Sequence, residues 1–128
     1  MSPALSNELL LGRRVLVVED DYQIAADVAE ILHAAGAEVV GPVSNVRDAL
    51  RALDPMPDIA TLDVRLRGET SFRIADVLAL RRVPFVLVTG DADAIPIDYW
   101  GWPICRKPFT PGTILKTLAA VCPQQPTR

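Results

Sequence analysis

Residues that can take part in chemistry follow four short apolar runs of this 128-residue chain. In chain order they are Glu19 with Asp20, Asp63, Thr89 and Lys107. Carboxylate oxygens without nitrogen or sulfur donors select ions such as Mg²⁺, and neighbouring carboxylates resist joint ionisation unless a cation joins them. A metal ion, an ammonium group and a hydroxyl around one carboxylate form a cradle for a phosphoryl group that this carboxylate attacks. The residue types therefore predict metal-assisted phosphoryl chemistry.

The elements that position these residues alternate between strands and helices. Apolar runs that indicate buried strands cover residues 15–18, 37–40, 58–62, 85–88 and 103–105. Helices are expected from the Asp21 cap to Gly36, from the Ser44 cap to about Leu53, from about Ser71 to Arg81, and from the Thr110 cap, with Pro111 in first position, to Val121. We expect Gly41-Pro42 to close the second strand and Gly68 to open a loop.

The segment from Asp91 to Gly101 has a weaker pattern than the other connections. Pro96 lies in its middle, and no long apolar stripe with helical spacing runs through it. Because proline interrupts helical hydrogen bonding, any helix in this segment should be short.

Five strands that alternate with helices predict an α/β fold with a parallel sheet covered on both faces. Right-handed crossovers restrict the topology of such a sheet. Ligands bind at the carboxyl ends of the strands in these folds. Since the reactive residues follow strands, we expect them to meet at one edge of the sheet.

Composition and charge exclude several other classes of protein. A net charge of −3 with scattered basic residues argues against nucleic-acid binding. Cys105 and Cys122 lie far apart, so a zinc site is not expected. The first twelve residues lack the pattern of a signal peptide, and no apolar run approaches the length of a membrane span. We expect a soluble, cytoplasmic protein without membrane contact.

Taken singly, each of these residues also has an ordinary structural explanation. Glu19 and Asp20 suit the start of a helix, where acidic side chains are stabilised. Asp63 could be a solvated loop residue, Thr89 part of a turn, and Lys107 a surface lysine. Their joint occurrence at predicted strand ends favours function.

Four short motifs at these positions resemble the receiver domain of two-component response regulators. They are V-V-E-D-D at 17–21, L-D-V at 62–64, V-T-G at 88–90 and K-P-F at 107–109. The resemblance extends from about Arg14 to Ala120. It implies a doubly wound (βα)5, flavodoxin-like and CheY-like sheet of strand order 2-1-3-4-5, with a short or degenerate fourth helix. We expect a receiver domain over residues 13–122, between an N-terminal extension (1–12) and a flexible tail (123–128).

The resemblance also implies roles for individual residues. Asp63 matches the phosphoacceptor. Its metal partners would be Asp20, the main-chain carbonyl of Arg65, and Glu19 acting through water. Residues expected to bind and sense the phosphoryl group are Thr89 and Lys107, with a cis peptide bond before Pro108.

Two features bear on how such a domain would respond. Many receivers carry an aromatic residue three positions before the lysine, whereas Ile104 stands there in this chain. Arg65 and Asp91 lie two positions beyond Asp63 and Thr89, where family side chains tune the lifetime of the phosphate. These two could pair across the pocket mouth or be solvated, and the sequence favours neither.

The resulting expectation is a stand-alone signalling switch rather than an enzyme. A histidine kinase or phosphotransfer protein would supply the phosphoryl group with Mg²⁺, and an unidentified protein partner would respond; a homodimer is a further option. The main alternative is a phosphorylation-independent pseudo-receiver, to which Ile104 and the weak fourth helix point. A flavodoxin-like cofactor binder and a magnesium-dependent phosphatase fit the motifs less well.

Overall fold

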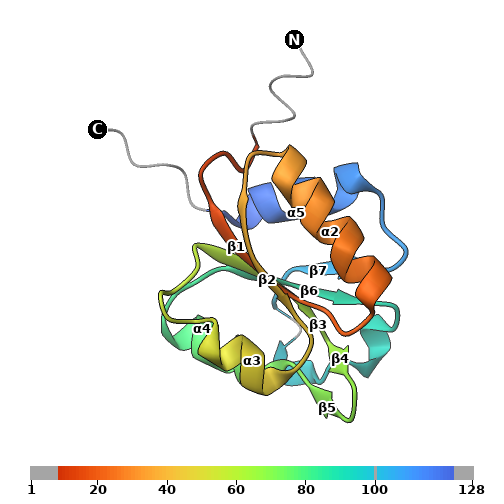
Figure 1. The fold of residues 1–128 in the computed structure, drawn as a ribbon. Coiled ribbons are helices and arrows are strands. Elements are labelled where there is room, and N and C mark those ends of the chain that lie inside the picture. The colour runs from red at the N-terminus through yellow and green to blue at the C-terminus, as the bar shows by residue number, and fades with distance from the viewer. Residues whose placement is uncertain (1–8, 100, 123–128) are drawn as a thin grey trace.

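The fold is a five-stranded parallel sheet with helices on both faces (Figure 1). The computed structural model describes residues 9–99 and 101–122. In sheet order, the strands are β2 (Glu38–Val43), β1 (Arg14–Val18), β3 (Ile59–Asp63), β6 (Phe85–Thr89) and β7 (Ile104–Arg106). Counted along the chain this is the order 2-1-3-4-5, so the predicted α/β class and topology are confirmed.

Two apolar clusters lie on opposite faces of the sheet, because successive strand residues point to opposite sides. On β1, Val15 and Val17 face the cluster beneath α2 (Tyr22–Ala34) and α5 (Pro111–Val121). Leu16 and Val18 face the cluster beneath α3 (Val46–Arg51) and α4 (Phe72–Leu80). Figure 1 shows these helix pairs on the two sides of the sheet. The buried faces fix the strands, and thereby the edge where the reactive residues meet.

The predicted helix caps hold at two of the three named positions. Asp21 accepts hydrogen bonds from the N–H groups of Gln23 and Ile24, both at 3.0 Å. Thr110 accepts one from Thr113 N–H at 3.1 Å.

The third helix is shorter than predicted, and its cap is a different residue. Asn45, not Ser44, caps α3, because the Asn45 side chain accepts the Asp48 N–H at 2.8 Å. The helix ends at Arg51, two residues before the expected end at about Leu53.

The second strand does not end at Gly41-Pro42, as the sequence led us to expect, but continues to Val43. Its pairing with β1 shifts register between Leu16 and Val18, which marks a bulge. Gly41 has φ +93°, and a Cβ there would lie 2.8 Å from the Val43 nitrogen, so glycine is required. The bulge brings the Val43 carbonyl within 2.9 Å of the Glu19 nitrogen, which donates to it.

A small antiparallel hairpin follows β3 in place of the expected loop. It consists of β4 (Arg65–Leu66) and β5 (Glu69–Thr70), with Gly68 in the turn at φ +72°. Two-residue strands carry too little periodicity to be recognised in the sequence.

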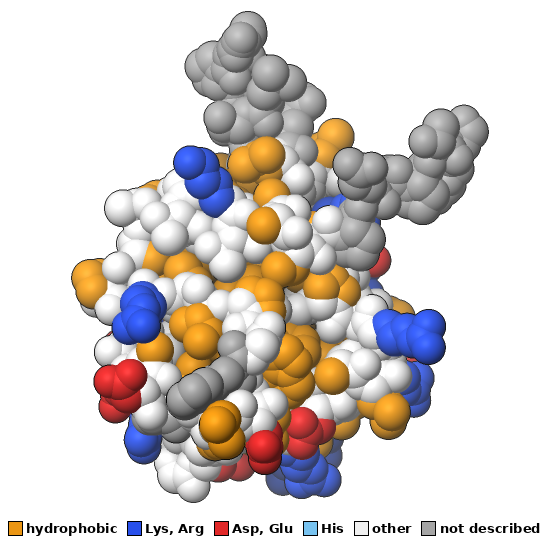
Figure 2. All heavy atoms as spheres, turned by 180° about the vertical axis from the view of Figure 1, so that it is seen from behind, with side chains coloured by type: hydrophobic (Ala, Val, Ile, Leu, Met, Phe, Trp, Pro, Cys, Tyr) orange, Lys and Arg blue, Asp and Glu red, His pale blue; other side chains and the backbone are white. Residues whose placement is uncertain are grey.

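The segment after β6 contains two short 3₁₀ helices, η1 (Ala92–Ala94) and η2 (Ile97–Tyr99), as the prediction of a short fourth helix requires. Three ring contacts hold η2 and the chain after it. Tyr99 stacks on Phe72 with centroids 4.4 Å apart, and Trp102 lies 4.6 Å from both Tyr99 and Phe85. Figure 2 shows the molecule from behind, where hydrophobic side chains gather at the centre and charged ones lie mainly toward the rim.

Leu10, expected to belong to an N-terminal extension, is part of the core. Leu10 is fully buried in the cluster beneath α2 and α5. Its N–H donates to the Ala35 carbonyl at 3.1 Å, and Gly12 N–H donates to the Gly36 carbonyl at 3.0 Å. Within the described residues, no helix combines the length and apolarity that crossing a membrane requires.

Ser71 allows a test of what a buried hydroxyl without a hydrogen bond costs in stability. It occupies the N-cap position of α4, but its buried hydroxyl makes no hydrogen bond within the described part of the chain. We expect Ser71→Ala to raise the free energy of unfolding by about 1 kcal/mol, because it removes an unsatisfied buried group. Thr110→Ala, which removes a functioning cap, should lower it by about 1 kcal/mol. Denaturant unfolding followed by circular dichroism measures both, and equal losses would contradict this account.

Candidate functional site

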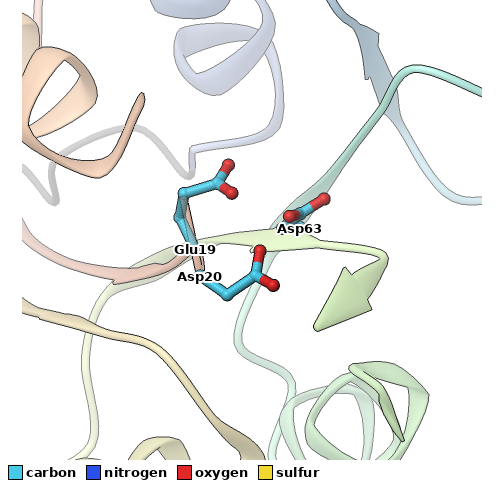
Figure 3. A group of neighbouring side chains, drawn as sticks. All are labelled: Glu19, Asp20 and Asp63. Carbon is cyan, nitrogen blue, oxygen red and sulfur yellow. The ribbon is translucent and has the colours of Figure 1, made fainter. Parts of the chain in front are cut away.

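Three carboxyl groups meet at the carboxyl edge of the sheet, as predicted. Glu19 and Asp20 follow β1, and Asp63 is the last residue of β3 (Figure 3). One oxygen from each lies within 4.8 Å of the others. Glu19 and Asp63 are only 5% and 7% exposed, whereas Asp20 is half-buried. The site is therefore a largely buried carboxylate cluster that opens to solvent beside Asp20.

Lys107 brings a positive charge into this cluster. Its Nζ lies 3.0 Å from Glu19 Oε1 and 3.4 Å from Asp63 Oδ1. The Lys107 N–H donates to the Thr89 carbonyl at 2.8 Å, which fixes the chain just beyond β7. The peptide bond between Lys107 and Pro108 is cis, as the resemblance implies.

Glu19 is oriented by contacts at both ends of the residue. Its main-chain N–H bonds to Val43, and its Oε2 accepts the Asp21 N–H at 3.1 Å. With Oε1 on Lys107, both carboxylate oxygens have partners within the protein. Glu19 therefore has a fixed position beside Asp63, and its action on a metal through water remains a prediction.

Asp63 has a strongly perturbed ionisation. Burial raises the pKa of Asp63 to about 8, and the hydrogen bond and negative charge of Glu19 act in the same direction. Lys107 lowers the pKa of Asp63 but does not offset these effects. Burial also opposes the charge on Lys107, yet Glu19 and Asp63 outweigh it and raise the pKa of Lys107 above its ordinary value. The ammonium group thus stays charged, whereas the ionised form of Asp63 is disfavoured.

Thr89 lies beside Asp63 at the same edge. Val88 pairs with Asp63 in the sheet, and Thr89 is the next residue of β6. The buried Thr89 Oγ1 accepts the Asp91 N–H at 3.0 Å. A hydroxyl that accepts one hydrogen bond can still donate its own proton. The Thr89 hydroxyl thus keeps a proton that it can donate, and its role toward a phosphoryl group at Asp63 remains a prediction.

The remaining predicted positions surround the cluster. Arg65, the first residue of β4, and Asp91 are both exposed, and among the residues described they form no ion pair with each other. This favours solvated side chains over pairing across the pocket mouth. Ile104, the first residue of β7, is half-buried and packs against the cluster beneath α3 and α4.

A divalent cation fits this set of residues. The donors are hard carboxylate oxygens, and three carboxyl groups face one ammonium group. Asp20 and Asp63 would hold Mg²⁺ with Glu19 beside it, and the positive charge of the ion would favour the ionised form of Asp63, which burial and Glu19 disfavour.

Comparison with known proteins relates both sequence and fold to one family. The solved structure of SdrG from Sphingomonas melonis Fr1 is 36% identical, with a TM-score of 0.76 over 88% of this chain and 97% of SdrG. Chemotaxis protein CheY4 of Vibrio cholerae is 25% identical, with a TM-score of 0.74 over 86% of this chain and 98% of CheY4. The transcriptional regulatory protein PdtaR of Mycobacterium tuberculosis is 30% identical over 89 residues.

By these similarities the chain belongs to the receiver-domain family of response regulators. The match with PdtaR covers 68% of this chain but 43% of PdtaR, so the chain spans less than half of that relative. No protein-family model matches the sequence.

One residue near the site was missed from the sequence. Glu69, on the unpredicted hairpin, accepts the Val46 N–H at 3.1 Å. The available signal was Gly68 directly before an acidic residue, which is consistent with a tight turn but does not identify the partner across 23 residues.

The raised pKa of Asp63 predicts pH-dependent Mg²⁺ affinity. Below about pH 8 the folded, metal-free protein keeps a proton on Asp63, and Mg²⁺ must displace it. The apparent affinity should therefore rise about tenfold per pH unit below the pKa of Asp63 and level off above it. Calorimetric titration across this range measures the slope. Asp63→Asn should remove this dependence of Mg²⁺ affinity on pH. An affinity in the unmodified protein that does not change with pH would count against the raised pKa of Asp63.

Proposed function

We propose that this chain is a phospho-acceptor receiver of a two-component system and that Asp63 accepts the phosphoryl group with the assistance of Mg²⁺. The observation that carries the proposal is the placement of the buried Asp63 carboxylate. Lys107 Nζ lies 3.4 Å away on one side, and Glu19 and Asp20 lie within 4.8 Å. A nucleophile, a cation and metal-binding oxygens are thus within reach of one phosphoryl group.

The transfer follows from these positions. A deprotonated Asp63 oxygen attacks phosphorus, the bond from phosphorus to the donor histidine nitrogen breaks, and the departing imidazole takes up a proton. A bound Mg²⁺ would supply positive charge to the phosphoryl oxygens. Lys107 neutralises another oxygen, and the Thr89 hydroxyl donates a hydrogen bond. These interactions stabilise the charge that develops during transfer.

A groove beside Lys107 offers a route for a protein donor. Its volume is about 580 Å³, and it is lined by residues of α2 and of the segment that joins β7 to α5: Ile24, Asp27, Glu30, Ile31, Lys107, Pro108, Phe109 and Pro111. A histidine kinase or phosphotransfer protein with an apolar surface next to its phosphohistidine would fit this groove. As a receiver of this kind, the protein would act in the cytoplasm. It would act on a protein partner and not on nucleic acid or membrane.

A pseudo-receiver that binds partners without phosphorylation is the second candidate. Ile104 favours it, because the aromatic side chain that many receivers use to report phosphorylation is replaced at this position. The carboxylate cluster and Lys107 favour the phospho-acceptor. Magnesium titration separates the two, since a pure interaction module has no reason to bind the ion.

Intact-mass analysis after incubation with a small acyl-phosphate donor tests the proposal directly. We expect a phosphoryl adduct that requires both Mg²⁺ and Asp63. Asp63→Asn should abolish the adduct, and Asp54→Asn, an exposed position before β3, should retain it. If neither the small donor nor a purified histidine kinase labels the protein, the proposal is wrong.

Removal of Lys107 should separate metal binding from the response to phosphorylation. In Lys107→Ala, Mg²⁺ affinity should be unchanged or slightly tighter, because a neighbouring positive charge is lost. The shift of amide resonances in residues 91–102 on phosphorylation should be greatly reduced. Lys116→Ala, on the exposed side of α5, is the matched control. A full response in Lys107→Ala would refute the role given to this lysine.

A further inference from the structure

The hairpin β4–β5 begins two residues after Asp63 and is too small to hold its own position. Each of its strands has two residues, with Arg65 paired to Thr70 and Leu66 to Glu69. Even longer isolated hairpins are only marginally stable in water. The position of this hairpin therefore depends on contacts with the rest of the domain.

Two of these contacts lie at the base of the hairpin and near its middle. Ser71 N–H donates to the Val64 carbonyl at 3.0 Å, which joins the chain before and after the hairpin. Leu66 is buried in the cluster beneath α3 and α4. The first contact closes the base of the hairpin next to both strands, and the second anchors β4 in the core.

Glu69 supplies a further contact, from within β5. Its Oε2 accepts the N–H of Val46, the first residue of α3, at 3.1 Å. That N–H has no acceptor within its own helix, and a carboxylate at this end of a helix is favourable. Glu69 thus joins the hairpin to α3, and Figure 1 shows β5 beside the start of that helix.

The same hairpin forms a wall of the candidate site. Arg67, in its turn, lines a cavity of about 610 Å³ together with Glu19, Asp20 and Asp48. A displacement of the hairpin would therefore change both the opening beside Asp20 and the backbone at Arg65, which lies two residues from Asp63.

We propose that Glu69 is a positioning residue of the magnesium site, which acts by fixing the hairpin to α3 and so holding the Arg65 main chain at a set distance from Asp20 and Asp63. The proposal rests on the proposed function, because it takes the Arg65 carbonyl as a metal ligand. Glu69 itself is exposed and bonds to α3, so its effect on the metal is indirect.

Two substitutions separate the hydrogen bond from the charge. Glu69→Ala removes both, whereas Glu69→Gln removes the charge and keeps an oxygen that can accept the Val46 N–H. Glu38→Ala is a matched control, because Glu38 is an exposed carboxylate that pairs with Arg14 at 3.3 Å at the amino end of the sheet.

The experiment has one readout with metal and one without it. Calorimetric titration gives the Mg²⁺ affinity of the full chain, and amide hydrogen exchange of Val46 by NMR reports the anchoring bond in the metal-free protein. Glu69→Ala should weaken Mg²⁺ binding by about tenfold, as loss of an outer partner of a metal site does, and should speed Val46 exchange. Glu69→Gln and Glu38→Ala should stay close to the unmodified protein in both readouts.

The outcomes distinguish this inference from the proposed function. If the unmodified protein binds Mg²⁺ and Glu69→Ala binds it equally well, the inference is wrong and the proposed function stands. Equal weakening by Glu69→Gln and Glu69→Ala, with slow Val46 exchange in both, would assign the effect to charge alone and also overturn the inference. If the unmodified protein binds no Mg²⁺, the proposed function fails and the inference fails with it.

Discussion

Lys107 lies between the carboxyl groups of Glu19 and Asp63, and these two contacts hold two acidic side chains together where water is largely excluded. The arrangement is costly, because burial disfavours the charged form of Asp63 and Glu19 adds a negative charge beside it, and the raised pKa of Asp63 reflects both effects. The packing of the rest of the domain offsets this cost in free energy. Parallel strands with two buried faces supply the free energy that keeps the charged edge assembled.

Much of this edge could be predicted from the sequence, because strand ends are marked by short apolar runs and the reactive residues follow them directly. Asp63 and Thr89 lie at the ends of β3 and β6 as expected. What escaped prediction depends on contacts between distant residues. The extension of β2 includes the bulge at Gly41, and Glu69 of the hairpin bonds to Val46, 23 positions away. No local periodicity reports such pairings.

The segment after β6 shows how the fold manages without a long helix there. Tyr99 stacks on Phe72 at the start of α4, and Trp102 packs edge-on against Phe85 within the sheet. Aromatic contacts thus provide the packing that a helical stripe would otherwise supply. Because Thr89 also bonds to Asp91 at the start of this segment, its position is tied to the edge that holds the carboxylates. Ile104 packs against the same apolar cluster as these rings, but its own side chain is not aromatic.

The burial of Leu10 sets a limit on how the domain can be delimited. Family motifs suggest a start near Arg14, yet Leu10 fills space beneath α2 and α5 and bonds to the Ala35 carbonyl. A shortened version that began at Arg13 would leave a leucine-sized void and lose about 2–5 kcal/mol, a large part of the stability of a small domain. Loss of phosphorylation in such a truncated protein would then report unfolding rather than chemistry.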